Sequence, residues 1–206
     1  MSTVTTNLFT NPVLANNATG WGQAGSTAGA RTDTTATIGD WSFRMVRDGT
    51  GNKGVRTGNI AVTAGLVYTA SIYVVSSVAS ALGRIDIDWY DGSAVSVGNN
   101  NVTAQSIGTD PSNPSRLVIT ATAPVGAVNA RVAAVTTGGT ISDTQDYTRL
   151  QFEQGPAATA FFHGGFPDTA QYRYDWTGTA HASTSTRTDL ETTLRRIRQQ
   201  FQLRPY

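Results

Sequence analysis

The chain has 206 residues, which is long enough for one sizeable domain plus an appendage, whereas two full domains would fit only tightly. Charged residues make up only 14% of the chain and the formal net charge is +1, so no global field steers the protein towards nucleic acid or an acidic membrane surface. Cysteine is absent, which excludes disulfides, thiolate catalysis and cysteine-ligated metals. No apolar run approaches the length of a membrane span, so we expect no membrane insertion.

Short runs with a period of two dominate the first three quarters of the chain, and Gly, Asp or Asn residues separate them. This pattern predicts an all-β fold, an antiparallel jelly-roll β-sandwich of about eight to ten strands that spans residues 1–162. A long polar loop is expected at residues 98–115. The clearest strands are predicted at 40–48, 54–63, 65–77, 82–92, 115–124, 126–135 and 146–155.

The alternation also predicts which side chains point inwards. A one-residue slip of the 82–92 strand would bury two aspartates, so the register of that strand is well specified. We expect core positions at Tyr68, Ala70, Ile72, Val74, Ile85, Ile87, Trp89, Leu117, Ile119, Ala121, Val128, Ala130, Val132 and Ala134, together with Trp21 and Trp41.

The outward positions of the same strands hold aromatic rings and hydrogen-bonding groups, the two ingredients of a sugar-binding surface. The alternative is a solvated face or a face that packs on another subunit. The candidate glycan-binding residues are Tyr73, Arg84, Asp86, Asp88, Tyr90 and Arg131.

Catalysis has little support in the sequence. His163 and His181 lack metal-ligand spacing, and no G-x-S-x-G nucleophile motif is present. Asp86 and Asp88 share a strand face about 7 Å apart, a spacing that a glycosidase could use, but no pocket is evident around them. We therefore expect a protein that is not an enzyme and that needs no cofactor.

Residues 163–187 differ from the rest of the chain. Tyr172, Tyr174 and Trp176 alternate with Arg173 and Asp175, which predicts a short strand with one aromatic face. Burial of such rings contributes on the order of 2 kcal/mol each, so the face should pack against the sandwich or a neighbouring subunit. We interpret the segment as an attachment segment.

The last segment, 188–206, predicts a short amphipathic helix that begins at Thr188, with a capping box formed by Thr188 and Glu191. A helix of this length is marginal alone in water, so its apolar stripe must fold back on the sandwich or meet other copies. The basic residues of the helix are too few for a nucleic-acid site, and none is expected. The stripe consists of Leu190, Leu194, Ile197 and Phe201.

Two family resemblances accompany these patterns. Three stretches carry the first resemblance: the opening 7–21 with Gly20-Trp21, the stretch 40–74 and the closing strand 146–162. Together they resemble the jelly-roll carbohydrate-binding modules. This resemblance implies a glycan-binding fold over roughly residues 7–162. Such modules often hold a structural calcium ion, to which Asp40, Asp48, Asp143 or Asp146 could contribute, although the sequence contains no EF-hand loop.

The second resemblance lies in the segment after the sandwich. It is similar to minor tail proteins of tailed phages that infect actinobacteria, although those proteins tend to have an acidic residue where this chain has His163. The resemblance implies a structural virion protein of the phage tail with other virion proteins as partners, self-associated as a trimer; a capsid decoration protein and a stand-alone glycan-binding module are the alternatives. The matching residues are Phe162, Gly164, Asp168, Thr169, Tyr172, Tyr174, Trp176, Thr177, Gly178, Thr179, Ala182, Ser183 and Ser185.

Overall fold

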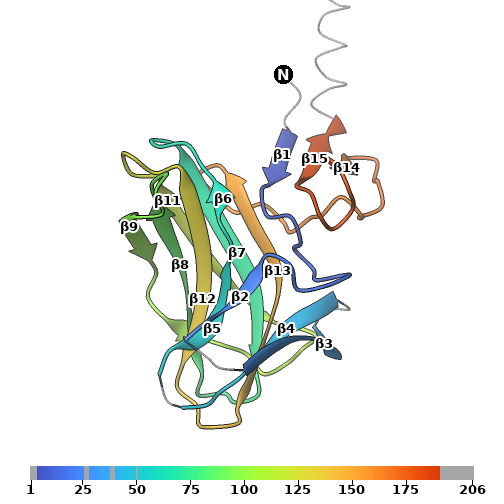
Figure 1. Ribbon diagram of the computed structural model, residues 1–206. Coiled ribbons are helices and arrows are strands. Elements are labelled where there is room, and N and C mark those ends of the chain that lie inside the picture. The colour runs from blue at the N-terminus through green and yellow to red at the C-terminus, as the bar shows by residue number, and fades with distance from the viewer. Residues whose placement is uncertain (1–3, 26–27, 38–39, 50, 191–206) are drawn as a thin grey trace, which may run out of the picture.

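The computed structural model describes residues 4–25, 28–37, 40–49 and 51–190, and it consists of strands joined by turns and loops (Figure 1). Within these ranges no helix is long and apolar enough to cross a bilayer. The strands are β1 (Val4–Asn7), β2 (Trp21–Ala24), β3 (Ala28–Thr37), β4 (Asp40–Val46), β5 (Lys53–Thr57), β6 (Ile60–Ala61), β7 (Val67–Ser76), β8 (Leu82–Tyr90), β9 (Ser96–Asn101), β10 (Gln105–Ser106), β11 (Ser115–Thr122), β12 (Asn129–Thr137), β13 (Thr144–Gln154), β14 (Tyr172–Trp176) and β15 (Ser185–Asp189).

Two antiparallel sheets form the sandwich. The front sheet has the order β10-β8-β12-β5-β2, with β9 paired to β8 and β6 paired to β12. The back sheet has the order β11-β7-β13-β4-β3. This arrangement confirms the predicted all-β antiparallel jelly roll. The number of strands exceeds the prediction, because the polar loop at 98–115 contributes short strands to the edge of β8 and because a third sheet forms beyond the sandwich.

The inward faces of both sheets pack as the alternation predicts. Ile72, Ile87 and Trp89 are fully buried, and most other predicted core residues are buried with them. Val128 is the exception, since 44% of it is exposed. It lies in the turn before β12, at the end of the sheet, where alternation no longer decides burial. Ala121 and Trp41 are only partly buried against the core.

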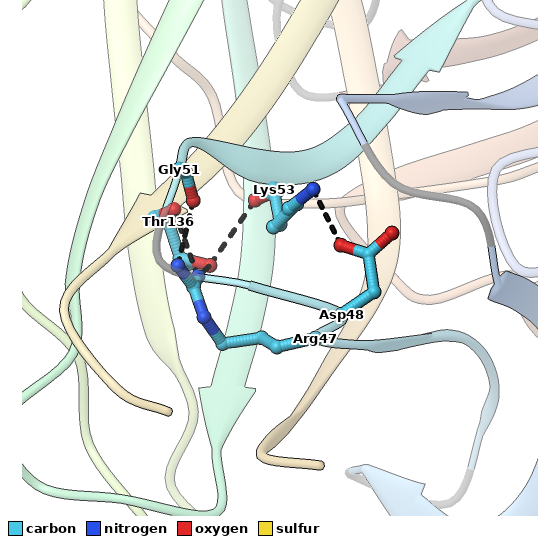
Figure 2. Close-up of polar contacts among 5 residues, drawn as sticks. All are labelled: Arg47, Asp48, Gly51, Lys53 and Thr136. Carbon is cyan, nitrogen blue, oxygen red and sulfur yellow. Dashed lines mark hydrogen bonds and ion pairs between the residues drawn. The ribbon is translucent and has the colours of Figure 1, made fainter. Parts of the chain in front are cut away.

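A buried arginine ties the loop between β4 and β5 to the front sheet (Figure 2). Arg47 is 1% exposed, and its guanidinium donates to the carbonyl oxygen of Thr136 at 3.1 Å and to that of Gly51 at 2.6 Å. Beside it, the Lys53 ammonium lies 2.5 Å from the Asp48 carboxylate. A buried charge is tolerated when it is hydrogen-bonded, and here backbone carbonyls accept from both terminal nitrogens of the guanidinium.

The third sheet joins the two ends of the described chain. Its order is β1-β15-β14, and Val4 pairs with Thr188 while Asn7 pairs with Ser185 (Figure 1). Residues 4–7, predicted as part of the sandwich, therefore belong to the sheet that the 163–187 segment builds. Thr188, predicted to begin the helix, lies instead in β15, because β1 and β14 supply hydrogen-bonding partners on both sides. Leu194, Ile197 and Phe201 lie outside the described residues.

The predicted aromatic strand is present as β14, and its rings pack within their own segment. Tyr174 contacts Phe162 and Phe166, with ring centres 6.3 and 5.6 Å apart, and Trp176 contacts His163 at 5.7 Å. Tyr172, Tyr174 and Trp176 are thus partly buried within a single chain. β14 and β15 pair as an antiparallel hairpin, which we call the C-terminal hairpin.

Candidate functional site

The outer face of the front sheet collects five of the six predicted glycan-binding residues. Arg84, Asp86, Asp88 and Tyr90 follow one another at alternate positions of β8. Arg131 lies on the neighbouring strand β12, directly opposite Asp88. The strong inward set of β8 fixes this arrangement, because burial of Ile85, Ile87 and Trp89 forces the alternate residues outwards.

Tyr73 does not belong to this group. It lies on β7 in the back sheet, where it pairs with Thr148 and Arg116 and has the Arg116 guanidinium 5.4 Å from its ring centre. The two sheets face in opposite directions, so Tyr73 and Tyr90 are on opposite sides of the sandwich. Alternation identifies the outer side of a strand but does not show which sheet the strand joins.

Neighbouring side chains hold the polar groups of the front-sheet face in place. The Arg131 Nε donates to Asn59 Oδ1 at 2.7 Å, and its guanidinium lies 4.5 Å from the centre of the Tyr90 ring. Asp88 Oδ1 accepts a hydrogen bond from the side-chain amide of Asn99 on β9. These contacts reduce the rotamer freedom that a ligand would otherwise have to remove.

Asp86 differs from Asp88 in its burial. Only 7% of Asp86 is exposed, and the Arg84 Nε lies 3.1 Å from its carboxylate. Burial raises the pKa of Asp86, while the charge and hydrogen bond of Arg84 act in the opposite direction. Asp86 therefore serves mainly to hold Arg84, and Asp88 is the more accessible carboxylate of the pair.

A hollow of about 550 Å³ adjoins these residues on β2, β5 and β12. Gly22 and Gly58 carry no side chain, so backbone forms the floor of the hollow at these positions. A Cβ built at Gly58 would meet no heavy atom within 4 Å. Arg56, Asn59 and Arg131 stand along its edge.

Sequence reasoning missed Arg56, Asn59 and Asn99. Arg56 has a detectable signal, since it occupies the outward position between the buried Val55 and Thr57.

A second hollow of about 290 Å³ continues the first. Both share Gly20, Gly58 and Asn59, so together they form one groove, which we name the front-sheet groove. The second part is more apolar, with Leu8 and Ile60 in its wall, and Thr184 from the C-terminal hairpin closes its far end.

His163 lies in the segment before β14 and His181 in the turn between β14 and β15, and neither lines the front-sheet groove. Their ring centres are 5.9 Å apart, and both pack against Trp176. Burial, followed by the nearby charges of His181 and Arg149, lowers the pKa of His163 to about 4. Burial also lowers the pKa of His181. Both are packing residues in this fold.

The aspartates considered for calcium have protein partners of their own. Asp48 pairs with Lys53, Asp146 forms a two-point ion pair with Arg44, and Asp143 accepts a hydrogen bond from the Thr140 backbone. The side chain of Asp40 lies outside the described part of the chain. In the ranges that the structure describes, no three histidine or acidic side chains gather as metal ligands would.

Comparison with known proteins gives a relationship of fold. No family model matches the chain, and no curated protein matches it. Among solved structures, a xylan-binding CBM22-1 domain from Paenibacillus barcinonensis Xyn10C is 17% identical with a TM-score of 0.55, and the match covers 71% of this chain and 94% of that one. These identities are low, so the likeness establishes the jelly-roll fold of carbohydrate-binding modules alone.

Two further structures place the same fold within larger proteins. The CBM22-1–GH10 modules of a Clostridium thermocellum endo-1,4-β-D-xylanase, solved with xylohexaose, give a TM-score of 0.56 at 11% identity over 69% of this chain. The enzymatically active domain of tailspike protein 4 from bacteriophage CBA120 gives 0.51 at 13% identity over 70%. The matched region spans only 28% and 20% of those two chains.

Proposed function

We propose that this protein is a non-catalytic glycan-binding protein and that the front-sheet groove is its binding site. The observation that carries the proposal is the groove itself, an open channel with a glycine floor beside a row of fixed polar side chains. The jelly-roll fold, shared with xylan-binding modules, supports it.

The chemistry of the face suits sugar hydroxyls. Asp88 and Asn99 offer acceptors and donors, and Arg131 offers further donors beside the Tyr90 ring. Each sugar hydroxyl must exchange its bonds with water for bonds with protein, so several adjacent, pre-oriented groups are needed.

The state of the carboxylates supports the proposal of binding without cleavage. A glycosidase needs an acid and a second carboxylate that both reach the scissile bond. Asp86 is largely buried beneath the ion pair with Arg84, so the pair of Asp86 and Asp88 lacks a second accessible carboxylate.

A matched pair of tyrosine substitutions tests the site. We expect Tyr90→Ala to weaken binding to a glycan array or to host cell walls by about tenfold, because Arg131 loses the ring that supports it. Tyr73→Ala removes a tyrosine that also packs under an arginine, but on the back sheet, and should leave binding unchanged. Equal effects of the two changes, or no binding by the parent protein, would contradict the proposal.

We further propose that the protein is displayed on a phage tail, where it acts in host attachment. Two observations support this location: residues of the tail-protein motif build a defined hairpin against β1, and a phage tailspike shares the sandwich fold. Gold-labelled antibodies against the purified protein should mark the tail of the virion in electron micrographs. Label confined to the head would favour a capsid decoration protein, and unlabelled particles would favour a stand-alone module.

A further inference from the structure

We propose that the front-sheet groove binds an acidic glycan, with a carboxylate, sulfate or phosphate group of the ligand held between Arg56 and Arg131. This inference rests on the proposed glycan-binding function and specifies the charge of the ligand.

Arg56 presents an uncompensated positive charge at the groove. It is exposed on β5, with Gly22 and Ala133 opposite it on the two neighbouring strands. Neither neighbour has a side chain that can pair with a guanidinium. Within the part of the chain that the structure describes, no hydrogen bond or ion pair engages Arg56. Its fork of N–H donors is therefore available for an oxyanion.

Arg131 supplies a second guanidinium, which is already oriented. Asn59 accepts from its Nε at 2.7 Å, and the Tyr90 ring supports the guanidinium at 4.5 Å. No other described side chain accepts from its two terminal nitrogens, and both arginines line the same hollow. A guanidinium fixed on two sides loses little entropy when it binds an anion.

The acidic side chains of the same face do not cancel this charge. Asp86 is paired with Arg84. Asp88 keeps its charge because its partner Asn99 is neutral, but within the described residues no ion pair joins Asp88 to Arg131, and Asp88 does not line the larger hollow. The described lining of the larger hollow contains both arginines and no carboxylate. With a formal net charge of only +1 for the whole chain, the attraction for an anion is local to the groove.

The neighbouring hollow indicates how the rest of the ligand lies. Past Gly58 the wall changes to Leu8, Ile60 and Ala61, which suits the C–H face of a sugar ring rather than a charged group. The groove thus matches a polymer in which an acidic unit occupies the arginine end and the next ring occupies the apolar end.

Affinity electrophoresis of the full chain, checked by calorimetry at about 0.15 M salt, tests the inference. The acidic probes are polygalacturonate for carboxylate, dextran sulfate for sulfate and a poly(glycerol phosphate) teichoic acid for phosphate. Neutral xylan, galactan and dextran serve as the comparison. We expect at least one acidic probe to bind about tenfold more tightly than any neutral one, and the best acidic probe identifies the anionic group.

Substitution of the arginines distinguishes binding at a specific site in the groove from non-specific electrostatic attraction. Arg56→Gln and Arg131→Gln should each weaken binding of the best acidic probe by about tenfold. Arg173→Gln, at an exposed arginine of β14 outside the groove, is the matched control and should have no effect.

Three results overturn the inference in distinguishable ways. If neutral and acidic probes bind equally and Arg56→Gln has no effect, the acidic ligand is wrong and the proposed glycan-binding function stands. If Arg173→Gln weakens acidic binding as much as Arg56→Gln does, the attraction is non-specific. The proposed anion site between Arg56 and Arg131 is then wrong. If no polysaccharide binds the parent protein, both proposals are wrong.

Discussion

At the scale of single residues, buried polar side chains stabilise the irregular parts of this sandwich. Asn7 is fully buried; its Oδ1 accepts from the backbone N–H groups of Phe9 and Phe152, and its Nδ2 donates to the Leu150 carbonyl. Leu150 lies within the bulge of β13 and Phe152 lies just after it, and Arg149 in the bulge has a φ of 52°. One asparagine thus joins the third sheet to an interruption in the back sheet.

Replacement of this asparagine should be costly. Asn7→Ala leaves three backbone groups buried without a partner, so we expect the free energy of unfolding to fall by about 2–4 kcal/mol. Urea denaturation followed by circular dichroism measures the change. Asn113→Ala, at an exposed turn position, is the control and should stay within about 0.5 kcal/mol of the parent. A similar result for Asn7→Ala would contradict the proposed anchoring.

His163 should make stability depend on pH. Its pKa is lowered from 6.5 to about 4 in the folded chain, so between these values the unfolded chain binds the proton more readily. The free energy of unfolding therefore falls as the pH drops through this window and levels off below it. Denaturation midpoints at about pH 7 and pH 5 should differ less for His163→Phe than for the parent. Identical pH slopes would exclude this contribution.

Single residues also show which parts of the candidate site the sequence alone predicts and which it does not. The outward row on β8 was predictable, because Ile85, Ile87 and Trp89 leave no other register. Tyr73 was misplaced, since its strand has the same alternation and the assignment to a sheet depends on pairing with β13 and β11. Arg56 was missed because its neighbours in the groove come from β2 and β12, far away in sequence.

At the scale of elements, the groove exists because Gly22 of β2 and Gly58, the residue after β5, have no side chain. Gly22 lies opposite Arg56, and the Gly58 N–H donates to the Gly20 carbonyl at 3.0 Å, which joins the ends of the two strands. Backbone of β2 and of the connection between β5 and β6 therefore forms the floor of the channel.

A side chain added to this floor should close the channel without disturbing the fold. Gly58→Leu places a branched side chain in open space between the two hollows, so we expect at least about a tenfold loss of glycan binding and an unchanged melting temperature. Gly49→Leu adds the same side chain at another open position, away from the groove, and should bind normally. Unimpaired binding by Gly58→Leu would show that the ligand lies elsewhere.

The C-terminal hairpin was predictable in part. The alternation of Tyr172, Tyr174 and Trp176 gave β14 correctly, but the second strand, Ser185–Asp189, lacks an apolar face and has no such signal. Its formation depends on β1, which lies at the other end of the sequence. Close packing also matters, since a Cβ at Gly164 would lie 2.4 Å from the Trp176 backbone nitrogen.

At the scale of the whole molecule, the predicted trimer depends on the segment beyond the hairpin. The predicted stripe of Leu190, Leu194, Ile197 and Phe201 would fold back on the sandwich or meet other copies, whereas rings of β14 already contact Phe162 and Phe166 of the same chain. Light scattering should give three times the 21.8 kDa chain mass for the full protein and a single chain mass for a version that ends at Leu190. A monomeric full-length protein would contradict self-association through this stripe.

The pairing of β1 with β15 brings the two ends of the described chain together, which favours insertion of this fold into another protein. Val4 and Thr188 face each other across one ladder, so the path of the backbone leaves and returns at nearly the same point (Figure 1). Insertion of this domain between two adjacent residues of a loop in another protein would therefore change the distance between the ends of that loop very little. A circular permutant that links these neighbours and reopens at the exposed turn after Asp91 should likewise fold to the same architecture.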